Sequence, residues 1–259
     1  MIKRFTYLIC LLLVISCKQD SLSDLKKDTP IITAILESGS ISTEVKLFYL
    51  GMGHPSIPIN IQNAEMSLTS PNGIAVPLAY SNGVYRSAAN SIDLQPGTTY
   101  NLITNISDEK VSAICSLPPP IALVDASNTS FIINTNSLGT PAFLLSWNVL
   151  DPDKYSYLLV LENLEENLVE IPFNVPSGNF TDQFSGPWEF NGATIYDTDF
   201  KYYGHHRLKV MAMEKSVESI YFYGPSDLRG LLQNGPDNVE GGRGYVFGLS
   251  SFTLDLWVQ

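Results

Sequence analysis

Short runs in which apolar and polar residues alternate follow one another from Ile31 to the end of the chain. In "TTYNLITNI", for instance, Tyr100, Leu102, Thr104 and Ile106 recur at every second position. A period of two predicts strands with one buried face, and the Asn-Gly and Pro-Gly pairs between the runs predict tight turns. Strands at this spacing, without a sustained helical period, indicate an all-β chain built from β-sandwiches.

The proline run in "SLPPPIAL" interrupts this pattern. Proline cannot donate to a sheet ladder, and consecutive prolines favour an extended conformation, so we place a domain boundary after residue 118. The sequence therefore predicts two consecutive sandwiches, over residues 31–118 and 119–259. The second is expected to contain one short helical stretch, "SDLRGLLQ", and to close with the strands of "GYVFGLSSFTLDLWV" in a C-terminal hairpin.

The first 16 residues combine a positively charged start, "MIKR", with a twelve-residue apolar run, "FTYLICLLLVIS". A membrane-spanning helix needs about 20 residues, so this segment predicts a signal peptide over 1–16. Val14, Ile15 and Ser16 then lead into Cys17, and this approach resembles the bacterial lipobox. The resemblance implies lipid attachment to the Cys17 thiol, cleavage before it, and a lipidated tether over 17–30.

The cysteines and the net charge bear on disulfide bonding, on the class of partner and on the mode of membrane attachment. Of the three cysteines, Cys10 lies in the apolar run and Cys17 at the cleavage point, so Cys115 has no partner for an intramolecular disulfide. We expect Cys115 to be a buried structural thiol. The net charge of -11 repels phosphate backbones, which excludes nucleic acid as a partner. Membrane attachment is therefore expected through the lipid anchor and not through a basic patch.

Two fold resemblances accompany this organisation. The segments "AEMSLTSPNG", "GVYRS" and "LQPGTTYNLI" of residues 31–118 resemble the carboxypeptidase-regulatory, transthyretin-like sandwich, an Ig-like arrangement. The second half, with Trp147 on an early strand and "HRLKVMAME" on a late one, is similar to a fibronectin type III module. It departs from that pattern at His206, where the family carries the tyrosine of its tyrosine corner.

Taken together, the lipobox, the two sandwiches and the terminal "NVEGGRGYVFG" resemble one family of Bacteroidetes lipoproteins, known only as a domain of unknown function. Genes of that family often lie beside TonB-dependent outer-membrane receptors. The resemblance therefore implies a partner of that class and an accessory role in nutrient uptake. Asp20 and Asp24 loosely resemble surface-export signals of such lipoproteins, which favours the cell surface over the periplasmic face of the outer membrane.

Polar motifs give little support for catalysis. His205 and His206 are adjacent and point to opposite faces of a strand, so they cannot share one metal. Asp197 and Asp199 would share a face of an extended segment and could ligate calcium, but no complete ligand loop surrounds them. The glycines of "EGGRGYVFG" fit a turn and lack the context of a phosphate loop. We expect no enzyme activity, no catalytic residue, no metal and no cofactor.

Aromatic residues are concentrated in "FSGPWEFNGATIYDTDFKYYGHH". Rings exposed among Asn, Asp and Gly can stack on sugars or peptides, whereas rings that fill the core have only a packing role. Packing is the favoured interpretation. If a glycan or peptide ligand binds, this is where we expect it, and the candidate ligand-binding residues are Trp188, Tyr196, Tyr202 and Tyr203.

The sequence thus predicts a lipid-anchored outer-membrane protein of two β-sandwiches that serves as a non-catalytic binding or assembly module. Two alternatives stay open at this point. One is an adhesin or fimbria-like structural subunit, for which a donor-strand tail at Leu254 to Gln259 would be evidence. The other is an accessory protein that binds glycans through its aromatic residues.

Overall fold

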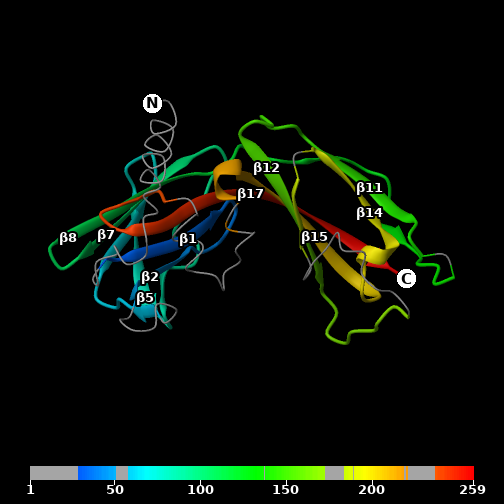
Figure 1. The fold of residues 1–259 in the computed structure, drawn as a ribbon, viewed down its shortest axis with the longest axis horizontal. Coiled ribbons are helices and arrows are strands. Elements are labelled where there is room, and N and C mark those ends of the chain that lie inside the picture. The colour runs from blue at the N-terminus through cyan, green and yellow to red at the C-terminus, as the bar shows by residue number, and fades with distance from the viewer. Residues whose placement is uncertain are drawn as a thin grey trace, which may run out of the picture.

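Two β-sandwiches lie side by side and are joined by one long strand in the computed structural model (Figure 1). The structure describes residues 29–50, 58–136, 138–172, 184–188, 190–218, 220 and 237–259. The chain is therefore all-β, as the alternating pattern predicts. In this part of the chain no helix is long and apolar enough to cross a membrane.

The first sandwich is a sheet that curls round a single apolar core. The order of its strands is β17-β1-β2-β6-β5-β4-β7-β8-β16, with β3 paired to β2. The strands that belong wholly to it are β1 (Ile31–Glu37), β2 (Glu44–Leu50), β3 (Pro58–Asn60), β4 (Glu65–Thr69), β5 (Ala75–Ser81), β6 (Val84–Ser87), β7 (Thr99–Ile106), β8 (Glu109–Ser116) and β16 (Val239–Glu240).

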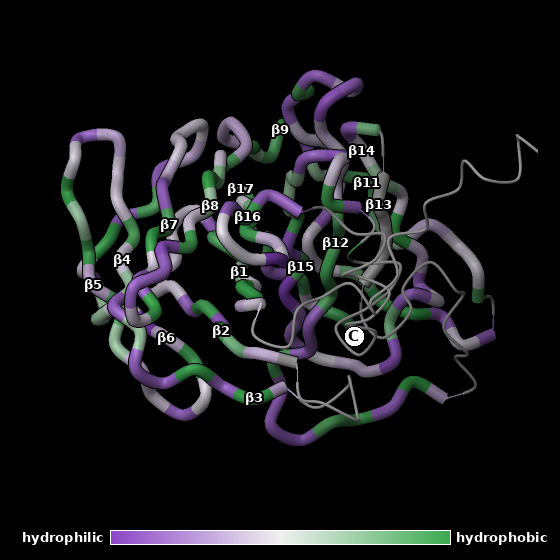
Figure 2. The backbone as a smooth tube through the Cα atoms, turned by 60° about the vertical axis from the view of Figure 1, so that its left-hand side comes forward, coloured by the Kyte–Doolittle hydropathy of each residue, from purple (hydrophilic) through white to green (hydrophobic). Residues whose placement is uncertain are grey.

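Alternation and turn chemistry produce this sheet. Tyr100, Leu102, Thr104 and Ile106 of β7 all face the interior, and hydrophobic and hydrophilic residues take turns along the strands in Figure 2. The Asn82-Gly83 pair turns β5 into β6 with φ of 50° and 87°, a left-handed conformation that Asn and Gly tolerate. Both features confirm the sequence prediction.

The second sandwich has two sheets that face each other across a core containing Trp147, Phe143 and Phe200. One sheet has the order β14-β11-β9, and the other β13-β12-β15-β17 with β10 added to β17. Its elements are β9 (Leu123–Ala126), β10 (Ser130–Phe131), β11 (Pro141–Trp147), β12 (Tyr155–Asn163), β13 (Phe184–Trp188), β14 (Gly192–Tyr196), the 3-10 turn η2 (Asp197–Asp199), β15 (Gly204–Glu214) and the 3-10 turn η3 (Lys215–Val217).

Strand β17 (Arg243–Val258) is shared by the two sandwiches. Its first half pairs parallel to β1, from Ile31↔Arg243 to Glu37↔Leu249. Its second half pairs antiparallel to β15. The sequence prediction assigned residues 119–259 to the second sandwich, so the first half of β17 lies on the other side of that boundary. The boundary itself, at the proline run, coincides with the end of β8 and the connection to β9.

Polar contacts hold the crossing point of β17. Ser250 donates its hydroxyl to the Pro118 carbonyl at 2.7 Å, and the Ser38 amide donates to the Leu249 carbonyl at 2.9 Å. The Glu37 carboxylate, at the end of β1, accepts from the Ser251 hydroxyl at 2.6 Å and pairs with Lys209 of β15 at 2.5 Å. One carboxylate thus ties β1, β15 and β17 together where the sandwiches meet.

A third apolar cluster covers the outer face of β12 and β15 near this crossing. It contains Met211 and Met213, which alternate with the core residues Val210 and Ala212 and therefore lie on the opposite face of β15. Both are buried because Phe247 and Leu249 of β17 and Val217 of η3 pack against that face. The predicted helical stretch "SDLRGLLQ" lies outside the described residues.

Candidate functional site

The aromatic residues chosen from the sequence do not form one surface. Phe200 is fully buried in the second core, and the Tyr203 ring packs against that core. Tyr196 and Tyr202 are half-buried, and the Lys201 ammonium lies 5.2 Å from the centre of the Tyr202 ring. The packing interpretation therefore holds for Phe200 and Tyr203, while Tyr196 and Tyr202 stay partly exposed.

Trp188 belongs to β13, where its backbone pairs with Tyr157 of β12. Its side chain lies outside the described part of the structure, as does the whole of Cys17, so both sites stay predictions. Phe190, two residues further on, is 71% exposed. This residue stands apart from the strands and serves below as a control position.

Asp197 and Asp199 lie in a 3-10 turn and not in the extended segment that the calcium argument assumed. The Asp197 carboxylate accepts from the Gly139 and Thr140 amides at 2.7 and 3.2 Å, and from the Thr140 hydroxyl at 2.9 Å. Asp199 accepts from the Tyr196 amide at 2.8 Å. Both carboxylates are buried and bind neighbouring loops, so their role is structural.

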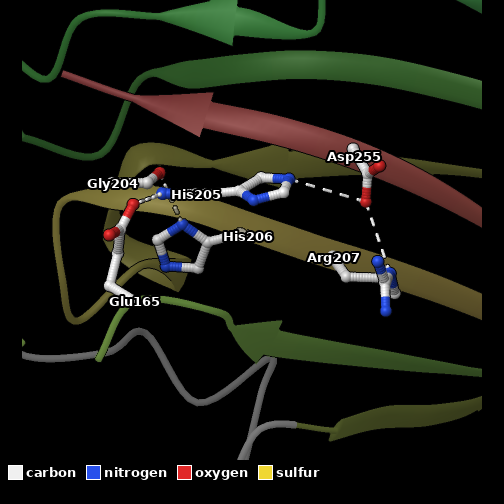
Figure 3. A network of polar contacts seen from close by, with 6 residues as sticks. All are labelled: Glu165, Gly204, His205, His206, Arg207 and Asp255. Atoms are coloured by element: carbon white, nitrogen blue, oxygen red, sulfur yellow. Dashed lines mark hydrogen bonds and ion pairs between the residues drawn. The ribbon is translucent and has the colours of Figure 1, made fainter.

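His206 takes the position that a tyrosine occupies in the fibronectin type III pattern. Its ring is buried, stands edge-on to Phe200, and directs Nε2 at the Asn163 side-chain amide at 3.1 Å. Its Nδ1 points at the Gly204 carbonyl, also at 3.1 Å (Figure 3). A carbonyl only accepts, so Nδ1 carries the proton. Asn163 donates through Nδ2, so Nε2 accepts. Burial lowers the pKa of His206 below its usual value and keeps the ring neutral.

The neighbouring His205 points the other way, as adjacent strand residues must. On this outer face the strand register places His205 opposite Trp257, and Arg207 opposite Asp255. The His205 and Trp257 rings are stacked, with centroids 4.5 Å apart and planes inclined by 6°. We call these four residues, His205, Arg207, Asp255 and Trp257, the platform.

Charged contacts organise the platform around Asp255. Arg207 Nε lies 3.3 Å from Asp255 Oδ1, and His205 Nε2 lies 3.6 Å from the same oxygen, as Figure 3 shows. The His205 backbone amide donates to Glu165 Oε1 at 2.7 Å, which fixes the start of β15. A guanidinium and a carboxylate therefore lie beside the stacked rings on one sheet face.

The platform is open to solvent. Trp257 is 50% exposed, and the side chains of Asp255 and Arg207 are 56% and 41% exposed. On the side away from His205, the register partner of Trp257 is Ser130, whose side chain is too small to cover an indole. An indole held in place by one stacked neighbour and half exposed is a ready surface for stacking.

Sequence reasoning missed this surface although the signal was present. In "LDLWV" Trp257 falls out of phase with Leu254 and Leu256, which face the core, so a strand must point the indole outward. What the sequence did not provide was the register that brings His205 and Trp257 together across two strands. The last tyrosine of the aromatic stretch singled out earlier, Tyr203, lies two residues before His205.

A hollow lies where the sandwiches meet, with a volume of about 470 Å³. It is lined in part by Cys115, Glu214, Asp237, Asn238 and Tyr245. Burial and the nearby Glu214 carboxylate raise the pKa of the Cys115 thiol to about 12, so the thiol is protonated at neutral pH. This agrees with the predicted structural role of Cys115.

The polar residues that line this hollow bind one another and neighbouring strands where the two sandwiches meet. Asn238 donates to the Ile114 and Val246 carbonyls and accepts from the Val246 amide. Asp237 pairs with Arg243 at 3.0 Å, and Glu214 with Lys154 at 3.6 Å. Within the described ranges no group of three or more His, Cys, Asp or Glu side chains is arranged to hold a metal. The platform is therefore the stronger candidate for ligand recognition.

No protein-family model and no curated protein matches this chain. Among solved structures, a segment of two fibronectin type III domains from chicken tenascin shares 9% identity, covers 89% of this chain and 99% of its own, and gives a TM-score of 0.23. Titin domains Z1Z2 in complex with telethonin share 11% identity over 91% of this chain and 98% of their own, with a TM-score of 0.23. At such scores the likeness assigns no function.

Proposed function

We propose that the chain is a non-catalytic binding module, anchored in the outer membrane by a lipid on Cys17 and accessory to a TonB-dependent receptor. In this role the two sandwiches form an arm. One end is attached to the membrane through residues 17–30, and the other presents a recognition surface. The module contributes tethering and surface complementarity and makes or breaks no bond.

The observation that carries the proposal is the position of the two ends along β17. Ile31, where the tether would enter the fold, pairs with Arg243 at the start of the strand. The platform residue Trp257 lies near its end, in the other sandwich. Fourteen residues of strand separate Arg243 from Trp257, which corresponds to about 45 Å at the usual rise of a β-strand. Attachment and display therefore lie at opposite ends of a continuous element (Figure 1).

The joint between the sandwiches supports the same role. Ordinary tandem domains connected by a linker change their relative orientation freely. Here a hydrogen-bonded strand passes through both domains, and the Glu37 contacts to Lys209 and Ser251 brace the crossing. Such a joint holds a recognition surface in a fixed direction, which lowers the entropic cost of binding.

Affinity purification from solubilised membranes tests this proposal, with the tag inserted in the 17–30 tether of the full chain. We expect an outer-membrane receptor of the TonB-dependent class to co-purify. The Cys17→Ala variant should leave the membrane fraction and lose incorporation of a fatty-acid analogue. Recovery of the chain without such a receptor contradicts the accessory role, and persistent labelling of Cys17→Ala contradicts the anchor.

A further inference from the structure

We propose that the platform binds a neutral saccharide, with one sugar ring on the indole of Trp257 and adjacent hydroxyl groups on Asp255 and Arg207. This inference rests on the proposed binding role and gives that role a ligand class. None of the platform residues is among the ligand candidates chosen from the sequence, because the platform depends on the register that brings β15 and β17 together.

The sheet offers this ligand side chains and no free backbone. β15 is paired on both edges, with β12 on one side and β17 on the other. At Trp257 the second edge of β17 is paired as well, because β10 lies beside it and the Trp257 amide donates to the Thr129 carbonyl at 2.9 Å. A peptide that binds by strand addition needs an open edge. A ligand on this face therefore meets side chains, an aromatic ring, a carboxylate and a guanidinium, which are groups that can bind a sugar.

Trp257 is arranged for contact with a flat apolar surface. Its stack on His205 fixes the indole, so little rotamer freedom remains to be lost on binding. A pyranose ring presents axial C–H groups on one face, and these pack against an exposed aromatic face. Trp257 and His205 lie at the end of the strand pair, where Gly204↔Val258 is the last pair of the register, so the platform lies at one end of the sheet.

The polar pair beside the indole fits the hydroxyl groups of a sugar. A carboxylate accepts several hydrogen bonds and a guanidinium donates up to five, so the contact between Asp255 and Arg207 leaves both with free capacity. Two adjacent hydroxyls can donate to Asp255 and accept from Arg207 at the same time. The charges of the pair cancel, and the chain as a whole carries -11, so an anionic ligand would be repelled. A neutral saccharide experiences no such repulsion.

Affinity electrophoresis with the full chain tests the proposal. The gels contain laminarin, xyloglucan, galactomannan, dextran or yeast mannan as soluble neutral probes. We expect at least one polysaccharide to retard the wild-type chain, and Trp257→Ala to reduce the association constant by about tenfold or more, as for a central aromatic contact. Phe190→Ala, which removes a more exposed ring outside the platform, should migrate like the wild type.

Two further variants keep the test decisive. Asp255→Ala alters an exposed side chain without touching the core, so it replaces Trp257→Ala if circular dichroism shows that the latter is unfolded. It should weaken retardation by the same polysaccharide, and Trp257→Phe should retain part of it. The proposal is overturned if no probe retards the wild-type chain, if Trp257→Ala and Asp255→Ala bind normally, or if Phe190→Ala loses binding equally. Trp257-dependent capture of casein peptides without retardation by any polysaccharide also overturns it, in favour of a peptide ligand.

The outcomes of this test can be distinguished from those of the receptor experiment. If a receptor co-purifies with Trp257→Ala and the wild type binds no saccharide, the accessory role is supported and the saccharide proposal is wrong. Saccharide binding without a receptor does the reverse.

Discussion

The two halves of β17 belong to the same strand but to different surroundings. Arg243 to Leu249 lies parallel to β1 and is buried or half-buried at every position, since packing covers both of its faces. Ser250 to Val258 lies antiparallel to β15, and its side chains alternate between the second core and solvent toward the C-terminal end. The first half is a joint, and the second is a surface for display.

Glycine accounts for much of this difference. A Cβ at Gly244 would lie 1.9 Å from the Ile32 carbonyl oxygen, and one at Gly248 would lie 2.6 Å from the Ser116 carbonyl oxygen. Neighbouring backbone thus approaches the first half more closely than any side chain permits. The second half contains no glycine and places Asp255 and Trp257 in solvent. One strand can therefore serve both purposes because its glycines, Gly244 and Gly248, lie only in its first half.

The largest expected effect on folding stability comes from adding a side chain to the first half of β17, at Gly244. Gly244→Val adds branched carbons where even a Cβ collides with the Ile32 backbone, at a φ of +119°. We expect the loss of cooperative folding, measured as the thermal transition followed by circular dichroism. Gly39→Val is the matched control, because Gly39 also has a positive φ, +75°, but has nothing within 4 Å of the added carbon. It should cost about 1–2 kcal/mol for the backbone conformation alone. Equal effects of the two substitutions would contradict the close approach at the joint.

The next effect compares the two cores through their shared strand. Leu256→Ala removes a fully buried side chain from the second core and should lower the free energy of unfolding by about 2–5 kcal/mol. Val246→Ala removes a smaller one from the first core and should cost about 1–3 kcal/mol.

Because β17 passes through both cores, each substitution should shift a single unfolding transition of the whole chain. The measurement is chemical denaturation followed by Trp fluorescence and by circular dichroism together. Two separated transitions, of which only one moves in each variant, would show that the sandwiches unfold independently and that the shared strand does not couple them.

These contrasts also mark how far the sequence could predict the structure. Alternation and turn residues give the strands and the inward faces correctly, as at Leu102 in β7, because each strand's burial follows its own pattern. They fail at Met211 and Met213, where packing from η3 and β17 covers the second face. The shared strand and the pair of His205 and Trp257 depend on register between distant segments, which no local pattern encodes. Packing was the favoured interpretation of the aromatic stretch, and it holds for Phe200, which fills the core.

A smaller effect distinguishes a braced contact from an ordinary surface pair. The side chains of Glu37 and Lys209 are 23% and 30% exposed, whereas those of Glu44 and Arg86 are 54% and 41% exposed. Glu37 also accepts from the Ser251 hydroxyl. We expect Glu37→Ala to cost about 1 kcal/mol and Glu44→Ala less than about 0.5 kcal/mol in denaturation experiments. Equal costs would indicate that Glu37 does not brace the crossing.

The smallest expected effect is a pH dependence of stability at the N-terminal end of β15. There His206 points into the core and His205 points toward the platform. Burial lowers the pKa of His206 below the ordinary value of 6.5, so the unfolded chain takes up this proton before the folded chain does. The stabilisation is therefore complete above pH 6.5 and is lost as the pH falls from there through the lower pKa of the folded state. Protonation would also set a new N–H at Nε2 against the Asn163 amide that donates to it.

Urea denaturation at intervals from pH 7.5 to 5 should thus show a decline in wild-type stability that His206→Tyr lacks. The comparison must be made as a difference between variants, because carboxylates contribute to both at the acidic end. His205→Gln is the control on the opposite face and should retain the decline, since the buried ring is unchanged. A decline that persists in His206→Tyr and disappears in His205→Gln would place the titration on the exposed face, against the burial that separates the two histidines.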